Sequence, residues 1–600
     1  MRFPPILSDI FFWVFIFVFG TIYEFAIVLY FSQKWWTSST AWNAATENLL
    51  AVLLVGLALG ILYAVITFGL RLTKIASKPV NFFTSPAAIA SATFIAIPIG
   101  FYVFDFFNSS STLIRWITSI VAGLLFYVLV YILWRKFFLS RRHALDRRVW
   151  AVIICLPFLF IGVTPIIRNH AFDSKHVSNG KVRNVVLISI DTLRFDHVSS
   201  YDPVHVQTPV LDEISREGAR FKVAISSIPQ TGPSHISMLT GLSPLDHGIH
   251  LNGLRLPSSA RTIASQLREA GFRTGAFVSG YPLKNFNCNL QTGFGVYNDV
   301  LAFNDRFRKV FYGRLLGKLP YFEYGVYRQA HEVTEPTLKW LKRNVDSPFF
   351  LFLHYYDPHY PYGIKPQRRR FKRPMWLKIP QKDLPRQKQL YAQEVQAVDV
   401  QIGRVVEFLK KSGMYDETLF LITADHGESL GEHGSFYSHE RYVYEQMIRV
   451  PFILRYPALI HPGTVFDKQV AVLDTYKTIS GATGVAPLPG NRGFDLIQLI
   501  RSGAANYSRT IPSYHFDYKV EGIRSDEWKL IHNGKSKSNQ FELYHLIQDP
   551  GEKVNLFSTE TVIANKLMRY MSSKNNFSDI DLEHLTAEQI EVLRSLGYLQ

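Results

Sequence analysis

Long apolar segments fill the first quarter of the chain. Five of them are long enough to cross the hydrocarbon core of a bilayer, which takes roughly 20 helical residues. They lie approximately at 7–31, 48–70, 86–104, 116–134 and 149–167. This pattern predicts a membrane domain of five transmembrane helices over residues 1–168. The first segment lacks a small-residue cleavage site, so we interpret it as a retained helix and not as a signal peptide.

The loops between these segments differ in charge. Residues 71–79 and 135–148 are rich in Lys and Arg, whereas residues 32–48 and 105–115 are nearly neutral. Because basic loops remain on the cytoplasmic side, the pattern predicts a cytoplasmic N-terminus. After an odd number of spans, the long C-terminal region is expected outside, in the periplasm or the extracellular space. The sequence thus predicts a multi-pass protein of the plasma (inner) membrane.

A different pattern begins after Arg168. Short apolar runs typical of buried strands occur at 184–191, 273–280, 348–357 and 418–425. Amphipathic segments that predict helices separate them, at 209–221, 260–271 and 387–412. Such alternation predicts an α/β fold with a mostly parallel sheet sandwiched between helices.

The same pattern suggests where the domains begin and end. Residues 169–183 are expected to form a linker, and residues 184–505 a catalytic core. Beyond about residue 505 the pattern is mixed, which is consistent with a small antiparallel sheet and a closing helix. We therefore predict a C-terminal subdomain over residues 506–600.

Charge and cysteine content narrow the functional classes. The formal net charge is +17, and much of the positive charge lies beside the apolar spans, which favours a membrane surface over nucleic acid as the partner. The chain has only two cysteines, Cys155 and Cys288, so a disulfide framework or a cysteine-based metal site is not expected. Composition does not set the oligomeric state.

Acidic residues and a histidine follow two of the predicted strands. Asp191 ends the first strand, and Asp425 and His426 follow a later one. In open α/β sheets, functional groups gather at the carboxyl ends of strands, and an Asp/Asp/His set suits a divalent cation such as Zn²⁺ or Mn²⁺. Thr231 precedes Pro233 at a predicted helix start, where backbone N–H groups favour an anion.

Five motifs in order resemble one family. They read LISIDTLRFDHVSSY, TPVLDEISREGARF, TGPSHISMLTG, HYYDPHYPY and ADHGESLGEHG. Together with the tail segments WKLIHNG and LYHLIQDPGEKVNL, they resemble the sulfatase branch of the alkaline phosphatase superfamily. The resemblance runs from about residue 184 to the C-terminus and implies an alkaline-phosphatase-like fold.

The resemblance also implies roles for individual residues. The metal ligands would be Asp191, Asp425, His426 and Thr231. Thr231 would also be the nucleophile that forms a covalent ester. His359 would assist the leaving group or the bound oxyanion, and His439 stands where sulfatases usually place an anion-binding lysine.

This chain departs from the sulfatase pattern at three places. Thr231 replaces the Cys or Ser that sulfatases oxidise to formylglycine, and His235 replaces the usual arginine. The segment 276–281 lacks the family's sulfate-binding Lys and His, and Ser279 and Tyr281 are the nearest matches there. His235 and Ser279 are the predicted substrate-binding residues. A threonine nucleophile after five transmembrane helices is instead similar to phosphoethanolamine and phosphoglycerol transferases.

Three functions therefore stay open. The departures favour a membrane-anchored phosphotransferase or phosphodiesterase that acts on lipid headgroups or envelope glycans through a phosphothreonine intermediate. The alternatives are a sulfuric ester hydrolase and a catalytically silent protein that binds glycan or lipid. The expected cofactor is one divalent ion, zinc or manganese before calcium. The resemblance to related phosphodiesterases leaves open a second ion at Asp357, His359 and His439.

Overall fold

The computed structural model describes residues 182–301, 326–363, 383–439, 442–504, 507–534, 540–571 and 590. All of them belong to one of the two units into which the chain divides. The five predicted spans lie outside the described residues, as does nearly all of the predicted linker. None of the helices in the described ranges is both long and apolar enough to cross a bilayer.

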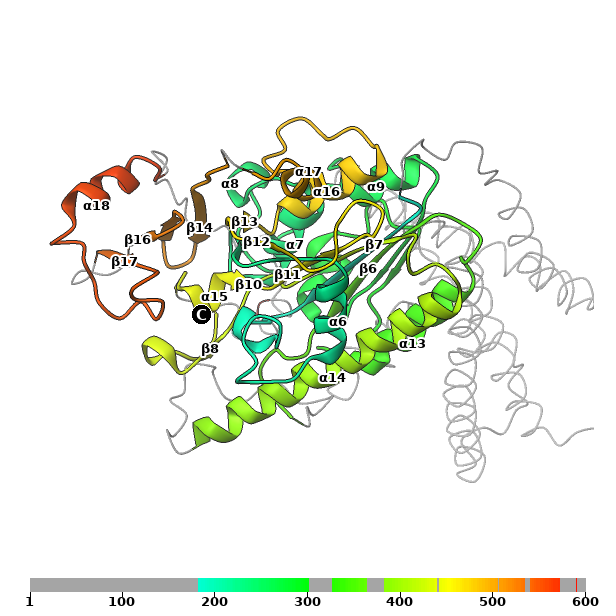
Figure 1. Ribbon diagram of the computed structural model, residues 1–600, viewed down its shortest axis with the longest axis horizontal. Helices are drawn as coiled ribbons and strands as arrows, with labels where there is room; N and C mark the ends of the chain where they lie inside the picture. Colours follow the sequence, from blue (N-terminus) through cyan, green and yellow to red (C-terminus); the bar gives the residue numbers. More distant parts are fainter. Residues whose placement is uncertain are drawn as a thin grey trace, which may run out of the picture. The chain divides into compact units, whose positions relative to one another are not determined.

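A central sheet organises the catalytic core (Figure 1). Its strands run in the order β12 (Thr464–Phe466), β2 (Ala219–Phe221), β11 (Phe452–Arg455), β7 (Thr418–Thr423), β1 (Asn184–Ile190), β6 (Phe349–Tyr355), β4 (Arg273–Phe277) and β5 (Val296–Asn298). The five strands from β7 to β5 are parallel, whereas β11 runs antiparallel to both of its neighbours. The prediction of a mostly parallel sheet is confirmed.

The middle strands are apolar on both faces because helices cover both faces. Every residue of β1, β6 and β7 is buried, as expected for a parallel sheet between two helical layers. One layer contains α6 (Pro209–Glu217), α13 (Ala330–Lys342) and α14 (Leu384–Lys411). The other contains α7 (Thr231–Thr240), α9 (Ile263–Glu269), α16 (Asp474–Thr483) and α17 (Leu496–Arg501) (Figure 1).

One predicted helix is too long. The amphipathic pattern extends over 209–221, but α6 ends at Glu217 and residues 219–221 form strand β2. This strand pairs with β11 and β12, which lie more than 200 residues further along the chain. Long-range pairing therefore overrides the local helical pattern.

Short elements complete the core. Two small sheets contain β3 (Ala224–Ile225), β10 (Arg449–Val450) and β13 (Val470–Ala471), and β8 (Ser429–Leu430) and β9 (Phe436–Ser438). The short α-helices are α8 (Pro244–His247), α10 (Asn285–Cys288) and α15 (Glu445–Ile448). The 3₁₀ turns are η2 (Phe195–His197), η3 (Tyr281–Leu283) and η6 (Glu432–Gly434).

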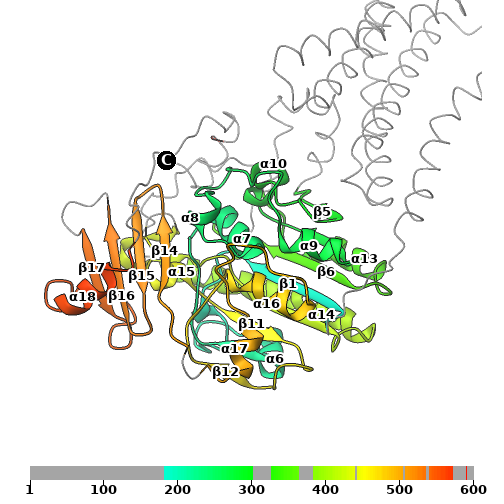
Figure 2. The same ribbon diagram turned by 90° about the horizontal axis from the view of Figure 1, so that it is seen from above.

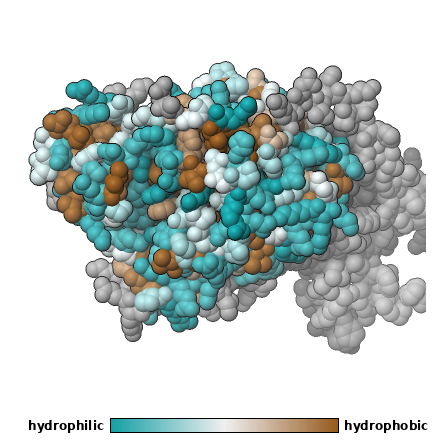
Figure 3. Space-filling model, viewed as in Figure 1, coloured by the Kyte–Doolittle hydropathy of each residue, from teal (hydrophilic) through white to brown (hydrophobic). Residues whose placement is uncertain are grey.

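The C-terminal region forms its own antiparallel sheet, as predicted. Its strands β14 (Ile511–His515), β15 (Val520–Arg524), β16 (Trp528–Asn533) and β17 (Phe541–His545) lie side by side in chain order, and α18 (Thr561–Met568) packs against them (Figure 2). On the face drawn in Figure 3, hydrophobic residues gather toward the end that carries α18. Exposed apolar side chains near that end include Ile547 and Val562.

Buried charges join this sheet to the core. The Lys529 ammonium of β16 lies 2.8 Å from Glu552 and 3.3 Å from Glu445 at the start of α15. The guanidinium of Arg524 donates two hydrogen bonds of 3.0 Å to Glu445. All four side chains are buried, so the contact depends on their mutual pairing.

Candidate active site

Two adjacent parallel strands deliver the acidic residues to one edge of the sheet. Asp191 follows β1 directly, and Asp425 follows β7 by two residues. The backbone N–H of Asp191 donates to Tyr355 O of β6 at 2.8 Å, which fixes the start of the loop. Asp191, Asp425 and His426 each offer a ligand atom, and these atoms lie within 4.8 Å of one another. The structure therefore brings the three predicted metal ligands together.

The backbone beside these residues adopts a strained conformation. Thr192 has a φ of 56°, which is uncommon for a β-branched residue. Its N–H donates to Asp425 Oδ1 at 3.2 Å, and its carbonyl accepts a 2.8 Å hydrogen bond from the buried Tyr391 hydroxyl. That hydroxyl also accepts from the N–H of Arg194 at 3.1 Å. Tyr391 of α14 thus stabilises the turn that presents Asp191.

Thr231 is the first residue of α7 and is fully buried. Two side chains of the same helix tie it to the acidic edge. Ser234 Oγ donates to the carbonyl of Asp425 at 2.8 Å, and His235 Nδ1 lies 3.7 Å from Asp425 Oδ2. Gly232 N–H donates to Asn252 Oδ1 at 2.6 Å, which fixes the start of the helix. No pattern in the sequence identified Asn252.

The described residues fit a divalent cation. Thr231 Oγ1 and His426 Nε2 are buried and have no hydrogen-bond partner among the described residues, although buried polar atoms normally have one. His426 Nδ1 lies 3.0 Å from the carbonyl of Gly427 and so carries the ring proton. Its Nε2 lone pair is therefore available for a metal ion, and the carboxylates of Asp191 and Asp425 supply hard oxygen ligands.

Burial sets the charge of this cluster. It raises the pKa of Asp425 to about 6 and lowers the pKa of His426 to about 4. Burial also lowers the pKa of His235, and it lowers the pKa of His354 well below the usual range. Near neutral pH the imidazoles are uncharged and the Asp425 carboxyl is ionised, so the site favours a cation.

His359 and His439 approach each other at the same site. Their Nε2 atoms are 3.4 Å apart. His359 Nδ1 lies 2.6 Å from Tyr360 O, and His439 Nδ1 lies 2.9 Å from the carbonyl of Pro229, two residues before Thr231. Because carbonyls only accept hydrogen bonds, Nδ1 carries the proton in each neutral ring, and Nε2 is the nitrogen that can accept a further proton.

A glutamate completes this second group. Glu428 offers a carboxylate oxygen within 4.8 Å of the ligand atoms of His359 and His439, and the Tyr362 hydroxyl donates to Glu428. The resemblance to related phosphodiesterases implied Asp357 as a ligand of a second ion, but its carboxylate accepts the N–H of Ala330 at the start of α13, at 2.8 Å. Sequence spacing could not distinguish the two acids.

The two substrate-binding candidates are held inside the protein. His235 Nδ1 lies 2.6 Å from the carbonyl of Thr231, and its Nε2 lies 2.8 Å from Ser189 Oγ. Ser279 Oγ donates to the carbonyl of His354 at 2.9 Å and accepts the N–H of Tyr356. Their role in substrate binding stays a prediction.

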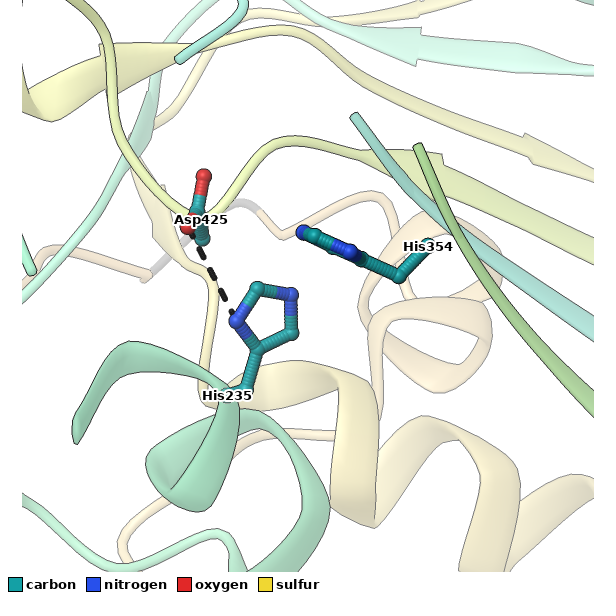
Figure 4. Close-up of side chains that lie close together, drawn as sticks. All are labelled: His235, His354 and Asp425. Atoms are coloured by element: carbon teal, nitrogen blue, oxygen red, sulfur yellow. Dashed lines mark ion pairs between the residues drawn. The ribbon is translucent and has the colours of Figure 1, made fainter. Parts of the chain in front are cut away.

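His354 joins the site, where the sequence alone favours a supporting or structural role over a catalytic one. It is the last but one residue of β6 and lies 3.3 Å from Asp191 Oδ2. Figure 4 shows its ring beside His235 and Asp425. Its position at a strand end was the signal that could have identified it.

Comparisons with known proteins identify the family of the chain. The family model described as Sulfatase matches residues 183–485, and the model described as N-sulphoglucosamine sulphohydrolase, C-terminal, matches residues 431–583. An "Ulvan-active sulfatase" of Formosa agariphila is 25% identical over 53% of this chain, which spans 65% of that relative, just under two thirds. An "Arylsulfatase" of Clostridium perfringens is also 25% identical, over 63% of this chain and 90% of the relative.

A solved structure shows the same fold. The phosphonate monoester hydrolase of Agrobacterium radiobacter superposes with a TM-score of 0.52 at 19% identity, over 65% of this chain and 94% of that chain. The curated relatives above are named sulfatases. They favour the sulfuric ester hydrolase alternative over the phosphotransferase that Thr231 suggested.

Proposed function

The chain belongs to the sulfatase family, as its motifs predicted, and on this premise we propose that it is a metal-dependent hydrolase of sulfate esters with Thr231 as the attacking group. One observation carries the proposal. Thr231 Oγ1 is buried at the N-terminus of α7 without a hydrogen-bond partner among the described residues. The same helix is tied to Asp425, so the hydroxyl belongs to the acidic edge of the sheet.

The metal ligands in this proposal are Asp191, Asp425, His426 and Thr231. A bound divalent cation would lower the pKa of the Thr231 hydroxyl and stabilise negative charge on the substrate oxygens. The mixture of carboxylates and one imidazole favours zinc or manganese over calcium, which prefers oxygen ligands alone. The two carboxylates attract the cation, and the neutral imidazoles leave that attraction intact.

The residues of the chain account for each proton and bond in the reaction. Thr231 Oγ1 gives up its proton and bonds to sulfur, while the bond between sulfur and the leaving oxygen breaks. The Nε2 lone pair of His359 or His439 accepts the proton and returns it to the leaving alcohol. A water molecule then cleaves the threonine ester, so that sulfate leaves and the Thr231 hydroxyl is restored.

A phosphate ester is the second candidate substrate. It is favoured by Thr231 itself, because formylglycine cannot form from threonine as the family is understood, and because the similar phosphoethanolamine transferases use threonine. The same in-line attack on phosphorus would give a phosphothreonine ester, resolved by water or by an acceptor hydroxyl. For either group, membrane lipids or envelope glycans are the proposed substrate class, and the outward-facing, five-span anchor stays a prediction.

The decisive experiment compares an aryl sulfate with the matching aryl phosphodiester. The purified, metal-loaded chain is tested beside Thr231→Ala, Thr231→Ser and Thr240→Ala. Thr240 ends the same helix, and its hydroxyl donates to the carbonyl of Ile236, so it controls for changes in α7. We expect Thr231→Ala to lose at least about 10³-fold in kcat/KM, Thr231→Ser to retain part of the rate, and Thr240→Ala to behave as wild type.

The preferred substrate separates the two candidates. Faster Thr231-dependent cleavage of the sulfate supports the sulfatase proposal, and faster cleavage of the phosphodiester replaces it with the second candidate. Substantial sulfate cleavage by Thr231→Ala would show that the nucleophile is another group. If neither the wild type nor any variant cleaves either substrate, the catalytically silent protein that binds glycan or lipid is favoured.

A further inference from the structure

Two buried imidazoles lie beneath the acidic edge of the sheet (Figure 4). His235 comes from the first turns of α7, and His354 comes from the end of β6. Their rings meet edge to face, with centroids 4.9 Å apart and an interplanar angle of 84°. Each faces one of the proposed metal-binding carboxylates, which raises the question of whether the histidines are ligands themselves.

The hydrogen bonds of His354 determine which nitrogen carries its proton. The backbone N–H of Ser279 points at Nδ1 from 3.4 Å, and an N–H can only donate. Nδ1 is therefore the acceptor, and Nε2 carries the proton of the neutral ring. This protonated nitrogen lies 3.3 Å from Asp191 Oδ2.

The hydrogen bonds of His235 lead to a similar conclusion. Nδ1 lies 2.6 Å from the carbonyl of Thr231, so this nitrogen carries the proton. The same N–H side faces Asp425 Oδ2 at 3.7 Å. Nε2 lies 2.8 Å from the hydroxyl of Ser189, which can donate to its lone pair. Neither ring offers a lone pair to a cation shared with the carboxylates.

We propose that His354 and His235 are positioning residues for the metal-binding carboxylates of Asp191 and Asp425, and that neither histidine is a metal ligand. The Nε2–H of His354 attracts the Asp191 carboxylate from 3.3 Å, and the N–H of His235 donates to the carbonyl of Thr231 while facing Asp425 Oδ2 at 3.7 Å. Each ring thereby restricts the rotation of the carboxylate beside it. The inference rests on the metal site of the proposed function.

A neutral imidazole can orient a carboxylate without reducing its negative charge. A carboxylate can rotate about its last bond, and each freely rotating ligand costs entropy when a cation binds. A donor below the carboxylate removes this freedom in advance. A neutral imidazole does so without cancelling the negative charge that attracts the cation. Groups that hold metal ligands in this way typically change metal affinity by about 10–100-fold when they are mutated.

The test measures cation affinity and not turnover. The dissociation constant for Zn²⁺ or Mn²⁺ is measured by competition with a chromophoric chelator, on the full chain and three variants. His354→Leu removes the donor, and His354→Gln keeps an N–H at the end of a side chain of similar reach. Phe350→Leu is the matched control, because Phe350 is buried in the same strand and packs on Phe294, 5.7 Å between centroids.

We expect His354→Leu to weaken binding by about 10–100-fold, His354→Gln to restore most of the affinity, and Phe350→Leu to bind as wild type. Unchanged binding by His354→Leu would overturn the proposal, and so would equal losses in the Leu and Gln variants. If His354→Leu does not fold, His354→Asn replaces it, since the shorter amide cannot reach Asp191. If the wild-type chain binds no divalent ion, the metal site of the proposed function fails as well. If the variants bind the cation as expected but the wild-type chain cleaves neither ester, the proposed reaction fails and the present proposal stands.

Discussion

Replacing Lys529 by methionine should destabilise the C-terminal subdomain, and the loss should grow as the pH rises. Lys529 is fully buried in β16, with its ammonium 2.8 Å from Glu552 and 3.3 Å from Glu445. Methionine keeps the length of the side chain and removes the charge. The change therefore tests the buried charge and leaves packing nearly intact.

The two glutamates respond differently to this loss. Glu445 keeps the two hydrogen bonds from Arg524, each 3.0 Å long. Glu552 keeps one hydrogen bond, from the backbone N–H of Glu445 at 2.7 Å. Removing one partner of a buried ion pair typically costs about 3–5 kcal/mol. Because only Glu552 loses its counter-charge, we expect the lower end, about 3 kcal/mol, when Glu552 is ionised.

The pH dependence follows from the pKa of Glu552. Burial raises this pKa to about 7 in the folded protein even beside Lys529, against 4.5 for an ordinary glutamate. Without Lys529 the folded pKa rises further, so the folded state holds a proton that the unfolded state has released. Stability then falls as the pH rises above the unfolded pKa, by up to about 1.4 kcal/mol per pH unit. Near the unfolded pKa, Glu552 is neutral and the cost is small.

Hydrogen exchange measured by mass spectrometry would report this local stability. Peptides from β15 and β16 are compared at about pH 5.5 and pH 8 after correction for intrinsic exchange rates. The double variant Lys529→Met with Glu552→Gln should recover most of the loss at the higher pH, because no buried charge is left unpaired. A single-variant loss that is equal at both pH values, or absent at the higher one, would refute the reasoning.

Three other predictions concern the metal site and helix capping. Cation affinity should fall by about tenfold per pH unit below pH 6, because a proton competes with the cation for Asp425, whose pKa is about 6. His426, with a pKa of about 4, stays neutral over most of that range. A calorimetric titration in which cation affinity does not depend on pH would contradict this prediction. Tyr391→Phe should weaken cation binding by about 10-fold or more, since the Tyr391 hydroxyl holds the turn after Asp191. Tyr355→Phe is the control and should not weaken it, because the Tyr355 hydroxyl contacts α13. Equal effects of the two variants in a chelator competition would argue against this role of Tyr391. Thr262→Ala should cost about 1 kcal/mol in denaturant unfolding, because Thr262 caps α9 through a capping box, and an unchanged midpoint would count against it.

The sequence predicted the centre of the fold well because its strands are buried on both faces. The run at 184–191 is mostly apolar, and β1 occupies nearly the same residues. A strand that is buried on both faces can be predicted from its own residues, without knowledge of the strand with which it pairs. By contrast, residues 219–221 continue a helical pattern locally, and only pairing with β11 and β12 makes them a strand. That information lies far away along the chain.

The site was predictable only in part, for a related reason. Asp191, Asp425 and His426 stand at strand ends, where the order of elements alone suggests that they meet. His354 depends on the register between β1 and β6, which opposes it to Ser189. Glu428, and not Asp357, groups with His359 and His439. This depends on how the loop after β6 turns, because the Asp357 carboxylate accepts the N–H of Ala330 there. Neither register nor loop direction is written in the local pattern of one sequence.

The pairing of β1 with both neighbours has a consequence for how such a protein can change over generations. Ser189 pairs with His354 on one side and with Thr423 on the other. The loops that follow β1, β6 and β7 and carry the site residues therefore leave the sheet at the same level. Side chains alternate between the faces of a strand, so loss of a single codon within β1 would send its side chains to the opposite face. Insertions beyond the strand ends leave this level unchanged. Lineages should therefore vary freely in loop length here, while gaps inside β1, β6 and β7 are eliminated.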